Sequence, residues 1–199
     1  YTVEDWKTYL EWDLVNSYAS YLHNAIEKQN FYFYSTVMSG VKEQKPRWKR
    51  IVEQTDGSLG ELIGQVYVKD YLPKGSKEKL LEIGNNIRDV YAERIKTLDW
   101  MSEETKKKAL FKLSKIVMKV GYPDKWKDYS AIEIRADDLV GNRQRARAFE
   151  YADSLARLGK PVDRDEWHMS PQTVNAYYNP SNNEIVFPAA ILQPPFFDM

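Results

Sequence analysis

The sequence predicts a mainly α-helical fold, a bundle of several helices followed by a β-hairpin near the C-terminus. Over residues 1–160, apolar side chains recur at steps of three and four, which is the spacing of one face of an α-helix. After Pro161 the chain changes to short apolar runs separated by Pro and Asn, a pattern typical of strands and turns. We therefore expect a helical region over residues 1–160 and the start of a second region, which carries the hairpin, over residues 161–199.

The first helix is predicted to begin at Thr2, whose hydroxyl can accept a hydrogen bond as an N-cap. An aromatic patch, Phe31-Tyr32-Phe33-Tyr34, follows in the helical stretch that starts at Asn24. Aromatic residues make up 14% of the chain, so we expect wide, flat packing between helices. The apolar face of the first helix consists of Trp6, Tyr9, Leu10, Leu14, Tyr18, Tyr21 and Leu22.

A long helix is predicted to open at Pro46, because proline is tolerated in the first turn of a helix. Gly57, Gly60 and Gly64 lie inside it, and each costs about 1 kcal/mol relative to alanine. Either these small residues let another helix approach closely, or they mark a break near Asp56-Gly57. The apolar face of this helix consists of Trp48, Ile51, Val52, Leu59, Leu62, Ile63 and Val66.

The remaining helices are delimited by turn residues and polar caps. The run Pro73-Lys74-Gly75 ends the long helix, and Ser76 and Ser102 are the predicted N-caps of the next two. Either Asp137 or Asp138 is expected to cap the last helix. Acidic residues stand in the first turn after Ser102, where they interact favourably with the helix dipole.

Three short runs have the composition of strands. Residues 116–120 are β-branched and brief, and we interpret them as a lone strand. Residues 174–178 and 184–187 flank the sequence Asn-Pro-Ser-Asn-Asn, which is dense in turn-forming residues. Two such runs around a five-residue loop predict a β-hairpin.

Composition excludes several classes of protein. Lys plus Arg and Asp plus Glu number 29 each, whereas a nucleic-acid binder needs a basic excess to release counterions. The run Lys106-Lys107-Lys108 follows acidic residues and precedes leucines, so we interpret it as a solvated helix face. Cysteine is absent, which rules out disulfides and thiolate sites. No apolar run approaches the roughly 18 residues of a membrane span.

Most catalytic patterns are missing. Neither His23 nor His168 is followed by Glu, so the helical H-E-x-x-H zinc motif is absent. We interpret both histidines as ordinary surface or interior residues. The acidic pairs at 103–104 and 137–138 lie where helix caps belong, and the acidic loop at 163–166 contains Arg164, which favours ion pairing over catalysis.

The hairpin is the candidate binding feature. Asn175, Ala176 and Tyr177 stand in series on its first strand, and a free strand edge offers N–H and C=O groups at the spacing of an extended peptide. The Asn175 amide adds a donor and an acceptor. Tyr177 and the following Ile191, Phe196 and Phe197 can supply apolar walls. The alternative is a hairpin with a purely structural role.

The run VNAYYNPSNNEIVFPAAILQPPFF, residues 174–197, resembles the signature of the family of neprilysin, endothelin-converting enzyme and bacterial oligopeptidase O. Four upstream segments are similar to family segments in the same order: PRWKRIVEQTDGSLGELIGQVYV, LDWMSEETKKKAL, VGYPDKW and VDRDEW. The resemblance covers most of the chain and is weakest in the first 40 residues and around 127–158.

The resemblance implies a zinc-dependent, mainly helical endopeptidase that cleaves short peptides on the amino side of large apolar residues. It implies that Asn175 and Ala176 pair with the substrate backbone and that Tyr177 flanks the cleaved residue. Ile191 and Phe196 match positions that line the pocket on the other side. Tyr177 stands where relatives carry Phe, which is expected to adjust preference and not chemistry.

The resemblance also implies that the zinc helix, with two His and the general-base Glu, follows this tail. The chain lacks those residues, so we expect zinc in the full-length enzyme, none bound here, and no activity from this chain alone. The helical region is expected to be incomplete at its start and the hairpin region truncated. The partners are then a peptide substrate and the remainder of the catalytic domain, and Ile191, Phe196 and Phe197 would favour self-association.

Two further points follow from the resemblance. A helical binding or scaffold module that kept the fold without catalysis is the alternative function. The absence of cysteine and of N-glycosylation acceptors favours a bacterial source, because animal relatives are typically disulfide-bonded and glycosylated. For a bacterial member the cell envelope, periplasmic or surface-anchored, is the first expectation for its location and the cytoplasm the second.

Overall fold

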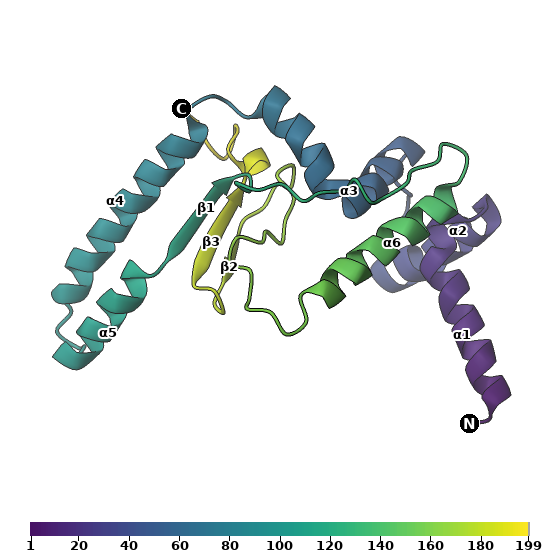
Figure 1. Cartoon of the computed structure of the whole chain (residues 1–199), viewed down its shortest axis with the longest axis horizontal. Helices are drawn as coiled ribbons and strands as arrows, with labels where there is room; N and C mark the ends of the chain where they lie inside the picture. Colours follow the sequence, from purple (N-terminus) through teal and green to yellow (C-terminus); the bar gives the residue numbers. More distant parts are fainter. Residues whose placement is uncertain (199) are drawn as a thin grey trace. The chain divides into compact units, whose positions relative to one another are not determined.

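A computed structural model describes residues 1–198, and it confirms the mainly helical fold with a hairpin near the C-terminus (Figure 1). The chain forms two compact units, one of residues 1–58 with 130–158 and the other of residues 59–129 with the chain from Gly159 onward. The predicted boundary between residues 160 and 161 separates the helical region from the region that carries the hairpin, and it stays a prediction. The elements are α1 (Val3–Tyr18), η1 (Ala19–Tyr21), α2 (Asn24–Phe31), η2 (Tyr32–Val37), α3 (Arg47–Tyr71), α4 (Ser76–Lys96), α5 (Glu103–Ser114), β1 (Val117–Gly121), α6 (Leu139–Ala156), β2 (Tyr177–Asn179), β3 (Glu184–Pro188) and η3 (Ala189–Ile191).

The first unit is held by capped helices and polar contacts. Thr2 caps α1 as predicted and forms a reciprocal capping box with Asp5. Asp138, one of the two predicted candidates, caps α6 through the N–H of Gly141. The guanidinium of Arg143 on α6 lies 5.7 Å from the ring centre of Tyr21. The aromatic patch spans the junction of two elements, because Phe31 ends α2 and the next three residues begin the π-helix η2.

The structure supports the predicted break in α3 and corrects the other interpretation of its glycines, because a loop and not a helix approaches them. The helix is interrupted at Leu59, whose φ of −134° and ψ of 33° are not helical, close to the predicted break. Gly60 and Gly64 also admit a neighbouring segment, because a Cβ added at Gly64 would lie 2.7 Å from Cδ of Pro171. Small residues here therefore let the loop that leads to the hairpin lie against α3.

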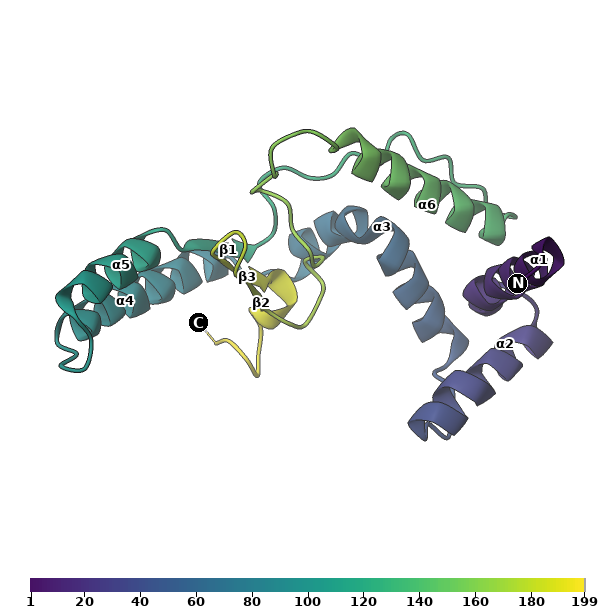
Figure 2. The same cartoon turned by 90° about the horizontal axis from the view of Figure 1, so that it is seen from below.

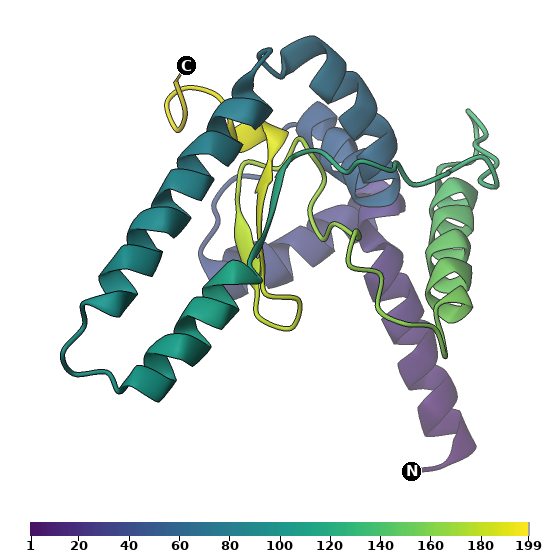
Figure 3. The same cartoon turned by 60° about the vertical axis from the view of Figure 1, so that its left-hand side comes forward.

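In the second unit α4 and α5 run side by side next to the sheet (Figures 2 and 3). Ser102 caps α5 as predicted, with its Oγ accepting from the Thr105 N–H at 3.2 Å. The prediction for Ser76 was wrong, because Gly75 is the N-cap of α4 and Ser76 is its first helical residue. Gly75 has a φ of +86°, a conformation that glycine adopts without strain.

The hairpin belongs to a three-stranded sheet of order β1-β3-β2. The run at 116–120 is not a lone strand, since β1 pairs in parallel with β3, Val117 opposite Glu184. The hairpin of β2 and β3 is confirmed, with Tyr177 opposite Val186. β2 begins later than predicted, at Tyr177, because the N–H of Asn175 turns back to the Thr173 carbonyl at 3.0 Å. Because the strand order is β1-β3-β2, β2 is the edge strand on the side of β3 away from β1.

No helix within residues 1–198 combines the length and the apolar character that crossing a lipid bilayer requires.

Candidate functional site

The predicted binding residues Asn175, Ala176 and Tyr177 lie in series at the start of the edge strand. Tyr177 is the first residue of β2, and the other two lead directly into it. β2 is hydrogen-bonded to β3 on one side. Within residues 1–198, no other strand pairs with its second edge. Asn175 is exposed, and its Oδ1 accepts from the Ala176 N–H at 2.8 Å. An incoming peptide would have to compete with this local contact for the Ala176 N–H.

The side chain of Tyr177 is fixed from the preceding loop. Its Oη accepts a hydrogen bond from the backbone N–H of His168 at 3.0 Å, and the two rings lie 5.8 Å apart at 48°. Burial raises the pKa of the Tyr177 phenol above its ordinary value, so the group stays neutral at physiological pH. It can therefore act as an apolar wall with a polar tip. The sequence had left His168 without a role, and the structure places it beside Tyr177.

Ile191 and Phe196 lie on a different segment, after β3. Ile191 ends η3 and is partly buried, while Phe196 is 66% exposed. Between them, Nε2 of Gln193 donates to Oη of Tyr67 on α3 at 2.8 Å, which anchors the segment. The role of Ile191 and Phe196 as pocket walls stays a prediction.

A buried ion pair lies behind the edge strand, and sequence reasoning missed it. Nζ of Lys119 on β1 lies 2.7 Å from Oε2 of Glu184 on β3, and the side chains are only 9% and 1% exposed. The other carboxylate oxygen of Glu184 accepts from Nδ2 of Asn179 at 3.2 Å and from Nδ2 of Asn182 at 3.4 Å. Lys119 also donates to the carbonyl of Glu166 at 2.9 Å.

The electrostatics of this pair favour its charged form. Burial alone would raise the pKa of the Glu184 carboxyl, but the ammonium of Lys119 and the amides of Asn179 and Asn182 lower it below its usual range. Glu184 is therefore ionised at neutral pH. A signal was present in the sequence, since Glu184 and Lys119 are single charges of opposite sign within two otherwise apolar strands.

Asn183 ties the hairpin loop to several neighbouring elements. Asn183 has a φ of +51°, which Asn tolerates better than most residues. Its Nδ2 donates to the Lys112 carbonyl at the end of α5, and its own carbonyl accepts from the Val117 N–H, both at 3.0 Å. Its Oδ1 accepts from Oη of Tyr178 at 2.9 Å. The loop is thus tied to α5, β1 and β2 at once.

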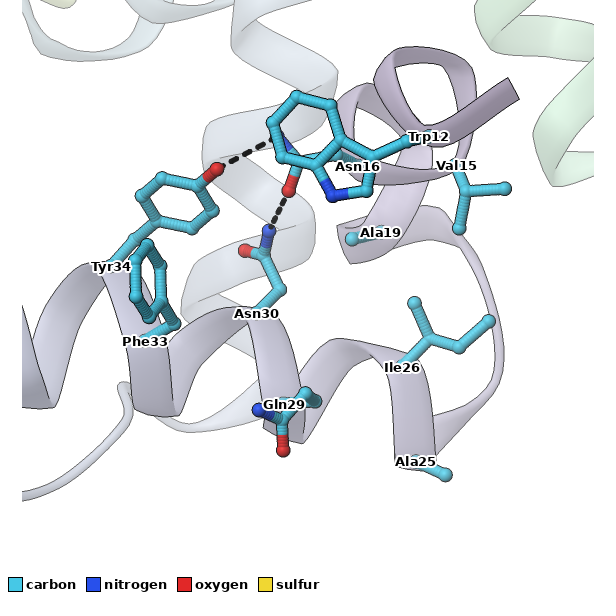
Figure 4. Close-up of a pocket in the computed structure, with 10 residues that line it drawn as sticks. All are labelled: Trp12, Val15, Asn16, Ala19, Ala25, Ile26, Gln29, Asn30, Phe33 and Tyr34. Atoms are coloured by element: carbon cyan, nitrogen blue, oxygen red, sulfur yellow. Dashed lines mark hydrogen bonds between the residues drawn. The ribbon is translucent and has the colours of Figure 1, made fainter. Parts of the chain in front are cut away.

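A second concave feature lies in the first unit, between α1 and the α2–η2 segment (Figure 4). The cavity measures about 510 Å³ and is mostly apolar. Asn16 crosses it, accepting from Asn30 at 3.0 Å and donating to Oη of Tyr34 at 3.1 Å. Its lining contains no carboxylate, histidine, lysine or cysteine, so it offers shape and hydrogen bonds but no catalytic groups.

No group of three or more His, Cys, Asp or Glu side chains suited to a metal ion is found in residues 1–198. What this part of the chain presents is a short edge strand backed by a buried ion pair.

Comparison with known proteins gives two family matches. The model of the N-terminal region of peptidase family M13 matches residues 1–123, and the model of the peptidase region of the same family matches residues 175–199. Human endothelin-converting enzyme 1 is 37% identical over 199 residues, covering 95% of this chain and 26% of the relative. An endothelin-converting enzyme homolog of Locusta migratoria is 34% identical, covering 96% and 27%.

Solved structures agree with these matches. The crystal structure of the Mycobacterium tuberculosis zinc metalloprotease Zmp1 with an inhibitor has a TM-score of 0.92 and 47% identity, covering 99% of this chain and 30% of that protein. PepO from Lactobacillus rhamnosis has a TM-score of 0.85 and 30% identity, covering 93% and 30%. The resemblance inferred from the residues is confirmed. The chain spans about a quarter of the length of the curated relatives that it matches.

Proposed function

This chain belongs to peptidase family M13, and we propose that it supplies the substrate-aligning strand of a zinc-dependent endopeptidase that cleaves short peptides. The observation that carries the proposal is the short edge strand β2, entered through Asn175 and Ala176, with one side open within the described sheet. An extended peptide that adds to such an edge gains backbone hydrogen bonds worth about 0.5–1.5 kcal/mol each.

The residues of the edge have distinct proposed roles. Asn175 is exposed, and its amide can both donate to and accept from a peptide backbone. Rotation of that amide away from the Ala176 N–H would free this donor for the substrate. Ala176 keeps the approach open because its side chain is small, and Tyr177 walls one side. Alignment of this kind holds the scissile bond in place, which is catalysis by positioning.

Substrate preference is the finer part of the proposal. Ile191 and Phe196 are apolar and lie in the segment after β3, as expected for two walls of a pocket that accepts a large apolar residue. Cleavage would then fall on the amino side of that residue.

Zinc would be held elsewhere in the complete protein. The donor groups present in residues 1–198 do not assemble a metal site, so no step of the reaction is assigned to them. When bound, zinc activates water for attack on the peptide bond. The contribution of this chain is to bind and orient the peptide.

The source and location are proposals of the same kind. The 47% identity to a mycobacterial protein and the absence of cysteine support a bacterial source. The cell envelope is the location we propose. Fractionation of the source organism, with detection of the protein in envelope or cytoplasmic fractions, distinguishes the two.

The test uses the complete peptidase that contains this chain. We expect Asn175→Ala to raise KM and lower kcat for a fluorogenic peptide, because the substrate loses contacts along the edge. The matched control is Asn86→Ala, an exposed asparagine on α4, which should leave both constants unchanged. Identical kinetics for the two variants would contradict the role of the edge, and absence of zinc-dependent cleavage by the complete protein would favour a non-catalytic binding module.

A further inference from the structure

The edge strand itself is too short to be rigid on its own. β2 contains three residues and is paired only to β3 in the described sheet. Edge segments with few hydrogen bonds are the ones that open most readily. A strand that must align a substrate to within a fraction of an ångström therefore needs support from outside its own backbone ladder.

The buried ion pair supplies support at one end of β2. Glu184 stands directly opposite Asn179 across the ladder, and its carboxylate accepts from the amides of Asn179 and Asn182. The last residue of the strand and the hairpin loop are thus attached to one buried side chain. Because Glu184 is 1% exposed at its side chain, water does not compete for these contacts.

The same pair reaches the other end of β2 through Lys119. Its ammonium donates to the Glu166 carbonyl at 2.9 Å. Two residues later, the His168 N–H donates to Oη of Tyr177, the first residue of the strand. Lys119 and Glu184 therefore connect the loop that holds Tyr177 with the loop that follows Asn179.

We infer that Glu184, charge-balanced by Lys119, is a positioning residue that holds residues 175–177 in the conformation that binds a peptide substrate. The inference rests on the proposed function, because it concerns the support of the same strand. Neither side chain touches the substrate. An apolar pair would fill the same space, but it would remove the acceptor of the Asn179 and Asn182 amides and the hydrogen bond from Lys119 to the Glu166 carbonyl.

Glu184→Gln in the complete peptidase is the first test. The change leaves the Lys119 ammonium buried without a counter-charge, so the network rearranges. We expect KM to rise about tenfold, equivalent to the loss of about one substrate hydrogen bond, with a smaller change in kcat. In an Asn175→Ala background the same change should have much less effect, because the contact that it positions is already gone.

The control is Glu27→Gln. Glu27 forms a buried ion pair with Arg50 in the other compact unit, with side chains 10% and 20% exposed, and it has no link to the hairpin loop. This variant should lower the melting temperature and leave KM unchanged. If Glu184→Gln does the same, the ion pair is only structural and the inference is overturned.

Asn179→Ala is the second variant, and it tests the same inference if Glu184→Gln does not fold. It removes one amide donor at the surface end of the network and keeps the ion pair, and we expect a severalfold rise in KM. Hydrogen exchange of the substrate-free protein separates the two proposals. Faster exchange at residues 175–177 in Glu184→Gln supports the positioning role of Glu184. This conclusion holds even if Asn175→Ala has no kinetic effect, because that result would refute only the substrate role of the edge strand. Unchanged exchange and unchanged KM overturn the inference.

Discussion

Gly64 is the position where one added methyl group should reveal how α3 holds the loop before the hairpin. In the Gly64→Ala variant the new Cβ would lie 2.7 Å from Cδ and 2.9 Å from Cγ of Pro171. Pro171 is fully buried, its ring is rigid, and its carbonyl accepts from the Ala190 N–H at 2.8 Å. The loop must therefore move as a body, and such overpacking costs about 1–3 kcal/mol.

Helix propensity opposes this cost but does not cancel it. Alanine is favoured over glycine by about 1 kcal/mol in a helix, so the expected net effect of Gly64→Ala is a loss of about 1 kcal/mol. Gly57→Ala is the matched control, because no atom lies within 4 Å of its added Cβ. That variant should gain up to about 1 kcal/mol.

Circular dichroism melting of the chain and its two variants tests the difference. For a chain of this size 1 kcal/mol shifts the melting temperature by about 2–4 °C. We expect Gly57→Ala to melt higher than the parent and Gly64→Ala to melt lower. If both variants melt higher by the same amount, the close approach of Pro171 to α3 does not constrain Gly64, and the packing argument is refuted.

The remaining predictions concern the ion pair and the exposed tail. Lys119→Met leaves Glu184 buried without its counter-charge and should cost about 3–5 kcal/mol. The loss is measured as faster native-state hydrogen exchange in β3, and unchanged exchange would show that the pair contributes little. Because the folded pKa of Glu184 is lowered, the stability that its ionised carboxylate contributes is present above the unfolded pKa and is lost as pH falls through the folded pKa. Acid-induced melting that is insensitive to Glu184→Gln would contradict this. The apolar residues Ile191, Phe196 and Phe197 should make the isolated chain self-associate, and sedimentation velocity should show less association for Phe196→Ser; a clean monomer of the parent chain would refute this.

Local signals in the sequence were sufficient for most of the helices. Thr2, Ser102 and Asp138 act as the caps that their positions predicted, because capping depends on a few neighbouring residues. The N-cap of α4 is Gly75 and not Ser76, because the start of this helix depends on the backbone conformation of Gly75 and not on side-chain chemistry.

The sheet shows where local reasoning stops. The pairing of β1 with β3 joins strands more than 60 residues apart, and nothing near residues 116–120 identifies the partner. The same long-range pairing brings Lys119 to Glu184, so the ion pair could not be placed from sequence even though each charge stood out in its strand. The late start of β2 follows from turn chemistry at Asn175, whose side chain bonds to the next backbone N–H.

Several helical faces that the sequence predicts as buried are exposed in this chain, including Trp48 and Val66 on α3. The chain spans about a quarter of its curated relatives. We propose that the remainder of the protein covers these faces, as it would provide the zinc site.

The central claim is that the edge formed by residues 175–179 aligns a peptide substrate. It is tested most directly by hydrogen exchange of the complete protein with and without a slowly cleaved peptide. We expect backbone amides of residues 175–179 to gain protection when the peptide binds, because they pair with it. Protection that appears elsewhere while these amides exchange at their substrate-free rate would contradict the account.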